Sequence, residues 1–412
     1  MGNAQADAAS LSRLRDYPRA FRMAVANVID GLGTYIGLAA LIVVGYHSSR
    51  LLGTAMVLAA NVLPGLFVTL FVAPRLQHRQ RRPVLLMLNF VGGVALLPAI
   101  VAPSAVTAIF AAAMLGAAGV ATRGVQMAAL AEAVPRAVRG KFYGMVGSFG
   151  QAVQVVGLAG GGAIAATLSP RIALAIDALS FGVAGLVIAS IRFARVDPQL
   201  SAGISGSVFG SAPRVVWSIP LLRMLACVTW IGALVGTVPE TASPAVTSTK
   251  LLPLVLAASP AGGALAALIG TRMGVFGRVV DTLRLALVSA ISLVVVGAGM
   301  YVAFQHPIDS PSRALYGVVS NVLIGGLGVW FLGMMAAFAE HTPQSDTVTV
   351  GTFMSWSVGA ASGLGGFVVA FLGVAGGYAA LGLLLVPASL WGLRMVSRSP
   401  VSVNHGGIEN QA

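Results

Sequence analysis

Residues 141–168 read KFYGMVGSFGQAVQVVGLAGGGAIAATL, and this stretch decides the fold class of the chain. It is long enough to cross a bilayer, because about 20 helical residues at roughly 1.5 Å each span the ~30 Å hydrocarbon layer. Its many glycines would weaken a soluble helix by up to ~1 kcal/mol each, but in lipid they let another helix approach closely. Ser148, Gln151 and Gln154 recur at helical spacing. The stretch therefore predicts a membrane helix with one tightly packed side and one polar side that faces protein or a water-filled cavity.

The composition extends this prediction to the whole chain. Of the 412 residues, 57% are hydrophobic and only 9% are charged, values that soluble domains do not reach. One cysteine, Cys227, and five scattered histidines offer no metal-ligand spacing, so we expect no metal site and no cofactor. The net charge of +13 comes from basic residues between apolar spans, so we expect the lipid bilayer as partner and not nucleic acid.

Apolar spans organise the chain into two sets of six around a basic, Gly/Ser-rich stretch. We predict an all-α integral membrane protein with twelve transmembrane helices in two six-helix, pseudo-symmetric bundles. The expected parts are a cytoplasmic tail (1–16), an N-terminal bundle (17–192), a cytoplasmic linker (193–218), a C-terminal bundle (219–396) and a second cytoplasmic tail (397–412). The spans are expected at 20–46, 51–74, 83–102, 104–127, 142–167 and 171–192, then at 219–246, 251–272, 282–304, 312–336, 349–371 and 376–396.

The distribution of Lys and Arg predicts the orientation in the membrane. Twenty of the 25 fall on one side of the expected spans, four fall on the other, and Arg123 lies inside the bilayer. Because positive residues gather on the cytoplasmic side, both termini are expected there. The excess of Arg over Lys, with much Ala, Gly and Val, indicates a high-GC bacterial source and hence a bacterial cytoplasmic (inner) membrane. Nothing in the sequence requires more than a monomer.

Charged residues inside the spans are the first functional candidates, because each costs ~2.5–3.5 kcal/mol at the centre of a membrane helix. Asp30, near the middle of the first span, forms one polar stripe with Asn27 and Thr34. It binds a proton or the cationic part of a substrate, or it is a structural acid satisfied by its neighbours. Arg123 keeps its charge and needs a partner, for which Asp30 is the candidate. Their pair is a proton-controlled switch or a permanent structural ion pair.

Two other acids and several polar residues complete the candidates. Glu240, between Pro239 and Pro244 near the outer end of the seventh span, accepts protons or gates the outer mouth, or is an interfacial acid. Asp177 is expected to be a helix-end acid of the sixth span. The expected substrate cavity is lined by Asn27, Thr34, Asn61, Gln126, Gln151, Gln154, Asn321 and Trp356. Absence of a Walker-type glycine loop and of a nucleophile–base pair in the sequence argues against ATP-driven transport by this chain alone and against an enzyme.

Three short patterns resemble motifs of one membrane-protein family. Arg123 and Gln126 have the Arg-x-x-Gln spacing of a motif that the family links to proton coupling. An antiporter motif, Gly-Pro-x-x-Gly-Gly in the family, is matched without its proline by Gly157, Gly161 and Gly162. Of the loop motif Gly-x-x-x-Asp-Arg-x-Gly-Arg-Arg, only Arg81 and Arg82 remain, and Gln77 replaces its acid. In the family this loop steadies the outward-facing state, so its loss here leaves that role in doubt.

These patterns, with ALAEAVPRAVRGKFYGM and AIDALSF within residues 129–184, resemble the major facilitator superfamily over residues 18–396, and most of all its drug-efflux and macrolide-efflux-like exporters. The resemblance implies a secondary active transporter that works by alternating access and exports a small amphipathic or hydrophobic compound, a drug or natural product, in exchange for protons. Two alternatives stay open: an uptake permease or lipid transporter of the same fold, and a non-transporting membrane receptor or scaffold. The latter would not need a charged interior.

Overall fold

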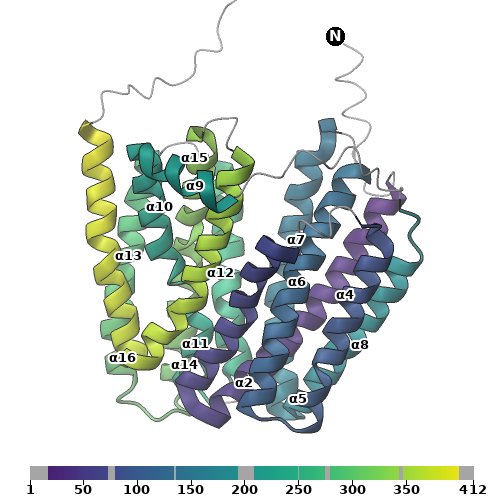
Figure 1. Cartoon of the computed structure of the whole chain (residues 1–412). Coiled ribbons are helices and arrows are strands. Elements are labelled where there is room, and N and C mark those ends of the chain that lie inside the picture. Colours follow the sequence, from purple (N-terminus) through teal and green to yellow (C-terminus); the bar gives the residue numbers. More distant parts are fainter. Residues whose placement is uncertain are drawn as a thin grey trace, which may run out of the picture.

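The computed structural model describes residues 17–72, 79–133, 136–193, 208–248, 250–273, 279–342 and 347–398. These residues form helices that run roughly side by side along one common direction (Figure 1), and none of the described residues is in a β-strand. Within the described part, nine helical segments are long and apolar enough to cross a membrane. The expected all-α membrane fold is therefore confirmed.

The first group of helices comes from the N-terminal half of the chain. Its elements are α2 (Pro18–Phe67), the π-helical turn η2 (Val68–Val72), α4 (Arg81–Ala95), α5 (Leu97–Val101), α6 (Ala105–Ala133), α7 (Arg136–Thr167) and α8 (Pro170–Ala189). Non-helical dihedral angles at Ser49 and Arg50 divide α2 into two segments. This break lies between the first two spans expected from the sequence.

The second group begins inside the expected linker. Its elements are α9 (Val208–Ser218), α10 (Pro220–Ala233), α11 (Val238–Val246), α12 (Leu252–Met273), α13 (Val279–Ala303), α14 (Pro311–Leu327), α15 (Val329–His341) and α16 (Thr347–Arg398). α16 is divided at Gly373, whose φ of 72° favours glycine. α9 packs against α10 and α16, so the expected linker contains a docked helix.

The helix breaks explain why nine long segments are found among the described residues where twelve spans are expected. The breaks at Arg50 and Gly373 fall where the sequence separates the first span from the second and the eleventh from the twelfth. α14 and α15 together cover the expected tenth span, but each has fewer than 18 residues (17 and 13). The arrangement therefore accommodates twelve crossings, and the count of twelve stays a prediction.

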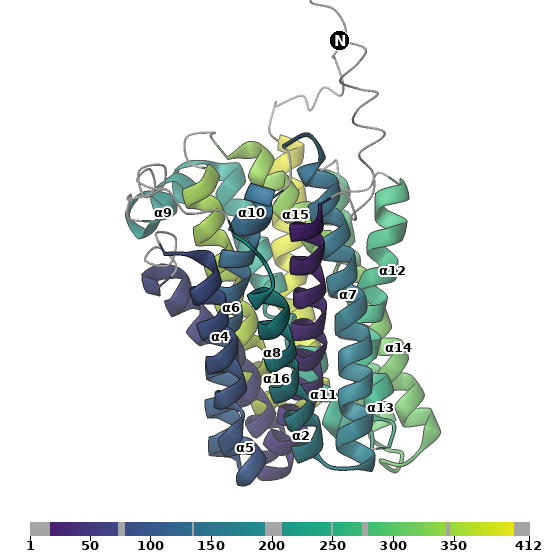
Figure 2. The same cartoon turned by 90° about the vertical axis from the view of Figure 1, so that its right-hand side faces the viewer.

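Helix packing defines two bundles and the contact between them. In the first group α2 packs against α6, α7 and α8, and in the second α16 packs against α10 and α13 while α12 packs against α14. The groups meet where α2 contacts α11 and α16, and where α7 contacts α12. Figure 1 shows α4, α6 and α8 on one side of the molecule and α10, α13 and α16 on the other, and Figure 2 shows the bundle from the side.

A glycine contact holds α7 against α2. A Cβ atom added at Gly161 would lie 2.5 Å from the Cα atom of Ile36, whereas one added at neighbouring Gly160 would meet nothing within 4 Å. We expect Gly161→Ala to lower the free energy of unfolding by about 1–3 kcal/mol, because the Ile36 backbone must move. Gly160→Ala is the matched control and should be neutral or stabilising by up to ~1 kcal/mol. Unfolding of the purified proteins in detergent measures both, and equal effects would contradict the packing.

Candidate functional site

A polar cavity of about 250 Å³ lies between α2, α6 and α7 of the first group. Its lining brings together six of the residues that the sequence places in a cavity or a proton-coupling site: Asn27, Asp30, Thr34, Arg123, Gln151 and Gln154. Helical periodicity explains this, because residues three, four and seven apart share one face of a helix. Tyr35 also lines the cavity. The polar pattern of the sequence does not predict Tyr35, because it lies next to the polar stripe of α2.

Asp30 and Arg123 share this cavity without forming the ion pair expected from the sequence. The described part of the chain has no ion pair between them within 4.0 Å, although they interact electrostatically. Arg123 is exposed, and its Nε donates to the carbonyl of Gly119 one turn earlier at 3.4 Å. The Oδ1 atom of Asp30 is buried and accepts no hydrogen bond from a described residue. The cavity thus holds a carboxyl group and a guanidinium group that do not pair with each other. Both remain available to a third group, such as a substrate.

Glu240 lies inside the helix bundle and not at the end of a continuous span. It belongs to the first turn of α11, just after the turn residues 234–237 that separate α10 from α11. Its Oε2 atom is buried and unpaired among the described residues. It interacts electrostatically with Tyr35 of α2 and Tyr378 of α16. Glu240 is therefore near the contact between the two groups, which disfavours the interfacial-acid alternative.

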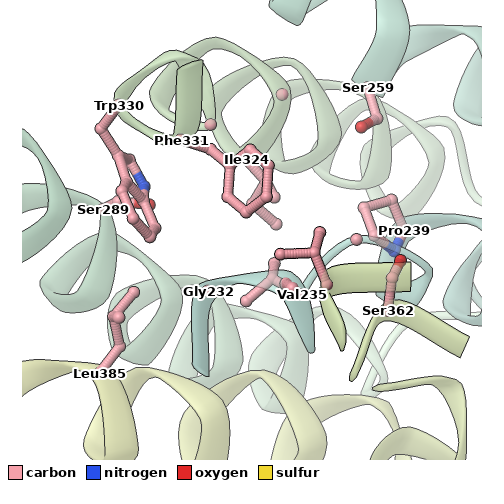
Figure 3. Close-up of a pocket in the computed structure, with 15 residues that line it drawn as sticks. Gly232, Val235, Pro239, Ser259, Ser289, Ile324, Trp330, Phe331, Ser362 and Leu385 are labelled. Carbon is pink, nitrogen blue, oxygen red and sulfur yellow. The ribbon is translucent and has the colours of Figure 1, made fainter. Parts of the chain in front are cut away.

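A second, mostly apolar cavity of about 290 Å³ lies in the second group. It opens where α10 gives way to α11 and where α14 gives way to α15, and broken helices of this kind often form binding sites in membrane transporters. Figure 3 shows Trp330 and Ser289 on one side and Ser259, Pro239 and Ser362 on the other. The Trp330 ring rests on Gly232, where an added Cβ would lie 2.5 Å from Cζ2. The otherwise apolar lining of this cavity therefore includes three serines, Ser259, Ser289 and Ser362.

Asn321 is a structural residue and does not line either cavity. Only 2% of it is exposed. Its Nδ2 donates to the Val255 carbonyl at 2.9 Å and to the Ser243 hydroxyl at 3.3 Å, and the Tyr378 hydroxyl donates to its Oδ1 at 3.3 Å. Asn321 therefore joins α14 to α11, α12 and α16, which corrects its expected place in the substrate cavity.

Three other expected cavity residues do not line the two cavities. The Nδ2 of Asn61 donates to the Ala112 carbonyl of α6 at 3.4 Å, so it joins α2 to α6. Gln126 is buried, with 6% exposed. The Trp356 ring stacks with that of Phe353 at 6.5 Å between centroids. None of the three lines the cavities described above.

The motif residues have packing roles in the structure. Gly157 and Gly161 face α2, and a Cβ at Gly162 would lie 3.1 Å from the Cα of Pro253 on α12, so Gly162 lies at the contact between the groups. At the start of α4, Arg81 is buried and Arg82 is exposed. Residues 73–78 of the loop motif lie outside the described residues.

Asp177 differs most from its expected role. It lies about two turns into α8, and none of its surface is exposed. The expectation of an acid at the amino end of the sixth span is therefore wrong. That end is instead capped by Ser169, whose Oγ accepts a hydrogen bond from the Ile172 N–H at 3.3 Å.

Comparison with known proteins identifies the fold and the family. The structure is similar to the nucleoside transporter NupG (TM-score 0.69, 11% identity, 92% of this chain and 98% of that one) and to a D-xylose-proton symporter (0.68, 14%, 91% and 97%). The POT family transporter PepTSo is also similar (0.71, 10%, 92% and 98%). No curated protein matches the sequence significantly. The sequence matches the Major Facilitator Superfamily over residues 23–366. Since this match covers most of the chain, which carries a polar cavity among membrane helices, the chain belongs to the Major Facilitator Superfamily.

Proposed function

We propose that the protein couples proton entry to the export of small amphipathic compounds by alternating access. The observation that carries the proposal is the pair of cavities: a polar one with Asp30 and Arg123, and an apolar one beside Trp330. A molecule with one polar and one apolar end has a partner for each. Asp30 holds either a proton or the substrate's polar end, so a proton from outside replaces the departing substrate and is released inside, and Arg123 responds to the change of charge. The proposed setting is a monomer in a bacterial cytoplasmic membrane, with both termini cytoplasmic.

The contact between the groups supports alternating access. A Cβ at Gly162 of α7 would meet Pro253 of α12, and one at Gly366 of α16 would lie 3.4 Å from the Cα of Ala55 on α2. Small residues let helix backbones touch with little interlocking of side chains. Such contacts suit two bundles that rock against each other around a central site.

Uptake is the second candidate, because one similar structure is that of a D-xylose-proton symporter. Both directions use the same cavities and the same acid. They differ in whether the substrate moves with the proton or against it. The degenerate loop motif at Arg81 and Arg82 does not decide between them.

The test is transport by purified protein in vesicles that enclose a pH-sensitive dye. A panel of radiolabelled amphipathic cations, anions and neutral compounds is offered under an imposed proton gradient of either direction. Exchange predicts that a compound moves against the proton flow, whereas symport predicts movement with it. The vesicles must be shown to be tight and to contain folded protein. If no compound of the panel then crosses in either direction, transport of amphipathic compounds is contradicted.

Filling the apolar cavity gives a sharper prediction. Val358 lines this cavity on α16, while Leu364 of the same helix is 49% exposed. We expect Val358→Trp to reduce transport of every panel compound at least about tenfold, because a loss of ~1.4 kcal/mol of binding is already a factor of ten. Leu364→Trp should transport normally. Equal transport rates for the two variants would remove this cavity from the substrate route.

A further inference from the structure

A buried carboxyl group outside the cavity remains without a role in the proposed cycle. None of Asp177 is exposed, and neither carboxylate oxygen accepts a hydrogen bond from a described residue. The neighbouring Ser180 hydroxyl donates to the backbone carbonyl of Asp177 at 2.7 Å, and it lies close enough to the carboxyl to offset a small part of the cost of ionising it. An ionised carboxylate without partners in such a place costs several kcal/mol, whereas a neutral carboxylic acid avoids most of that cost.

The Asp177 carboxyl lies directly on the backbone of α2. A Cβ added at Gly33 would lie 3.1 Å from Oδ1, and one added at Gly37 would lie 2.7 Å from the carboxyl carbon. The two glycines are one turn apart and leave a groove that the carboxyl fills. Asp30 precedes Gly33 by three residues on the same helix, and it interacts electrostatically with Asp177. One face of α2 therefore connects the cavity acid to the buried acid.

No positive charge in the described part of the chain compensates Asp177. Among the described residues, Asp30 of α2 is the charged group that acts on it. The helices packed against α8 are α2, α4, α5 and α7. The basic residues of α2 lie in its first two turns (Arg19 and Arg22) and at its break (Arg50), away from the Gly33–Gly37 face. The charged residues of α4 lie in its first turn, those of α7 in its first two turns, and α5 has none. Asp30 has Arg123 as a cation in its own cavity, but Asp177 has Asp30 as its charged neighbour, so ionising Asp177 beside an ionised Asp30 is costly.

We propose that Asp177 is a second proton-binding site, coupled to Asp30 across the Gly33–Gly37 face of α2, so that the two carboxyls together carry at most one negative charge. While Asp177 holds its proton, its carboxyl fits between the helices and α8 stays against α2. Loss of that proton drives the carboxylate toward water and loosens α8 from α2, the helix that lines the polar cavity. The role of Asp177 in the transport cycle rests on the proposed function, but its proton occupancy does not.

Infrared spectroscopy of the reconstituted full chain tests the site without a substrate. Aspartate labelled with ¹³C at its side-chain carboxyl separates the C=O band of protonated aspartic acid from that of glutamic acid, and pH is the probe. We expect native protein at neutral pH to show a protonated aspartate band that is absent from Asp177→Asn and present in Asp30→Asn. The pH dependence of the band should change in Asp30→Asn and stay the same in Asp309→Asn, which alters an exposed loop acid.

Each outcome decides the proposal. A band that persists unchanged in Asp177→Asn assigns the proton to another aspartate and overturns it, and so does native protein with no such band. The measurement on native protein needs no variant, so it tests the proposal even if Asp177→Asn does not fold. A band whose pH response is the same with and without Asp30 overturns the coupling. Failure of transport in vesicles while the band behaves as expected would refute the proposed function alone.

Discussion

Substrate-driven proton movement is expected to fall to the background of empty vesicles when Asp30 is replaced by asparagine. Among the described residues, Asp30 is the only carboxylic acid that lines the polar cavity. Asparagine keeps the size and much of the hydrogen bonding of the side chain but cannot bind and release a proton. The measurement is the dye signal on addition of a panel compound that native protein transports. Binding of the compound to the variant, followed by Trp fluorescence, should persist.

The control for Asp30→Asn is Asp309→Asn. Asp309 is exposed between α13 and α14, so this variant removes an acid without touching the cavity. It should give the native proton signal. A labelled compound that crosses equally well with native protein and with Asp30→Asn, with no proton signal in either, would make Asp30 structural and the protein a uniporter or a carrier coupled to another ion.

Local periodicity explains which cavity residues the sequence analysis found. Asn27, Asp30 and Thr34 lie on one helix, as do Gln151 and Gln154, and helical spacing alone places each set on one face. Asn321 and Asn61 have the same polar chemistry but serve helix contacts. Their roles depend on which helix lies opposite, and spacing within one span carries no information about that.

The breaks in the helices were less accessible to sequence reasoning than the spans. Apolar runs predict crossings because the bilayer sets their length. The separation of α10 from α11 at residues 234–237, and of α14 from α15 at Gly328, falls within single expected spans. These breaks are where the apolar cavity forms. The first break has one local signal, Pro239 in the first turn of α11. Contacts between helices, such as Trp330 on Gly232, also hold the breaks, and a single span does not reveal such contacts.

The two groups repeat one another's contacts. In the first group Gly116 of α6 packs on the backbone of Asn61 in α2, which joins the expected fourth and second spans. In the second group Gly325 of α14 packs on the backbone of Ser259 in α12, which joins the tenth and eighth. The equivalent spans therefore meet through a glycine in both halves. This parallel supports the pseudo-symmetry of the two bundles that the sequence predicts, and the domain boundaries stay predictions.

Arg313 gives the largest expected effect on stability. Its guanidinium donates to the carbonyls of Ala245 at 2.7 Å and Val246 at 2.9 Å, the last two residues of α11, and to that of His306 at 3.1 Å. It also lies 4.1 Å from the centroid of the Phe304 ring. The carbonyls at a helix end have no partner within the helix. We expect Arg313→Leu to lower the free energy of unfolding by about 3 kcal/mol, because one buried and two partly buried carbonyls lose their charged donor.

Arg284 is the matched control for Arg313, because both arginines lie near the start of a membrane helix and differ in burial. Arg313 is 8% exposed, whereas the side chain of Arg284 is 69% exposed and pairs with Asp281 at 3.3 Å. An exposed pair of this kind contributes at most about 1 kcal/mol. Arg313→Lys should recover only part of the loss, since one ammonium group cannot reproduce the planar fork of donors. Denaturant unfolding in detergent measures the stability of the four proteins. Native protein and Arg284→Leu should be equally stable, Arg313→Lys less stable and Arg313→Leu the least stable. If Arg313→Leu is as stable as Arg284→Leu, the Arg313 guanidinium does not hold the end of α11.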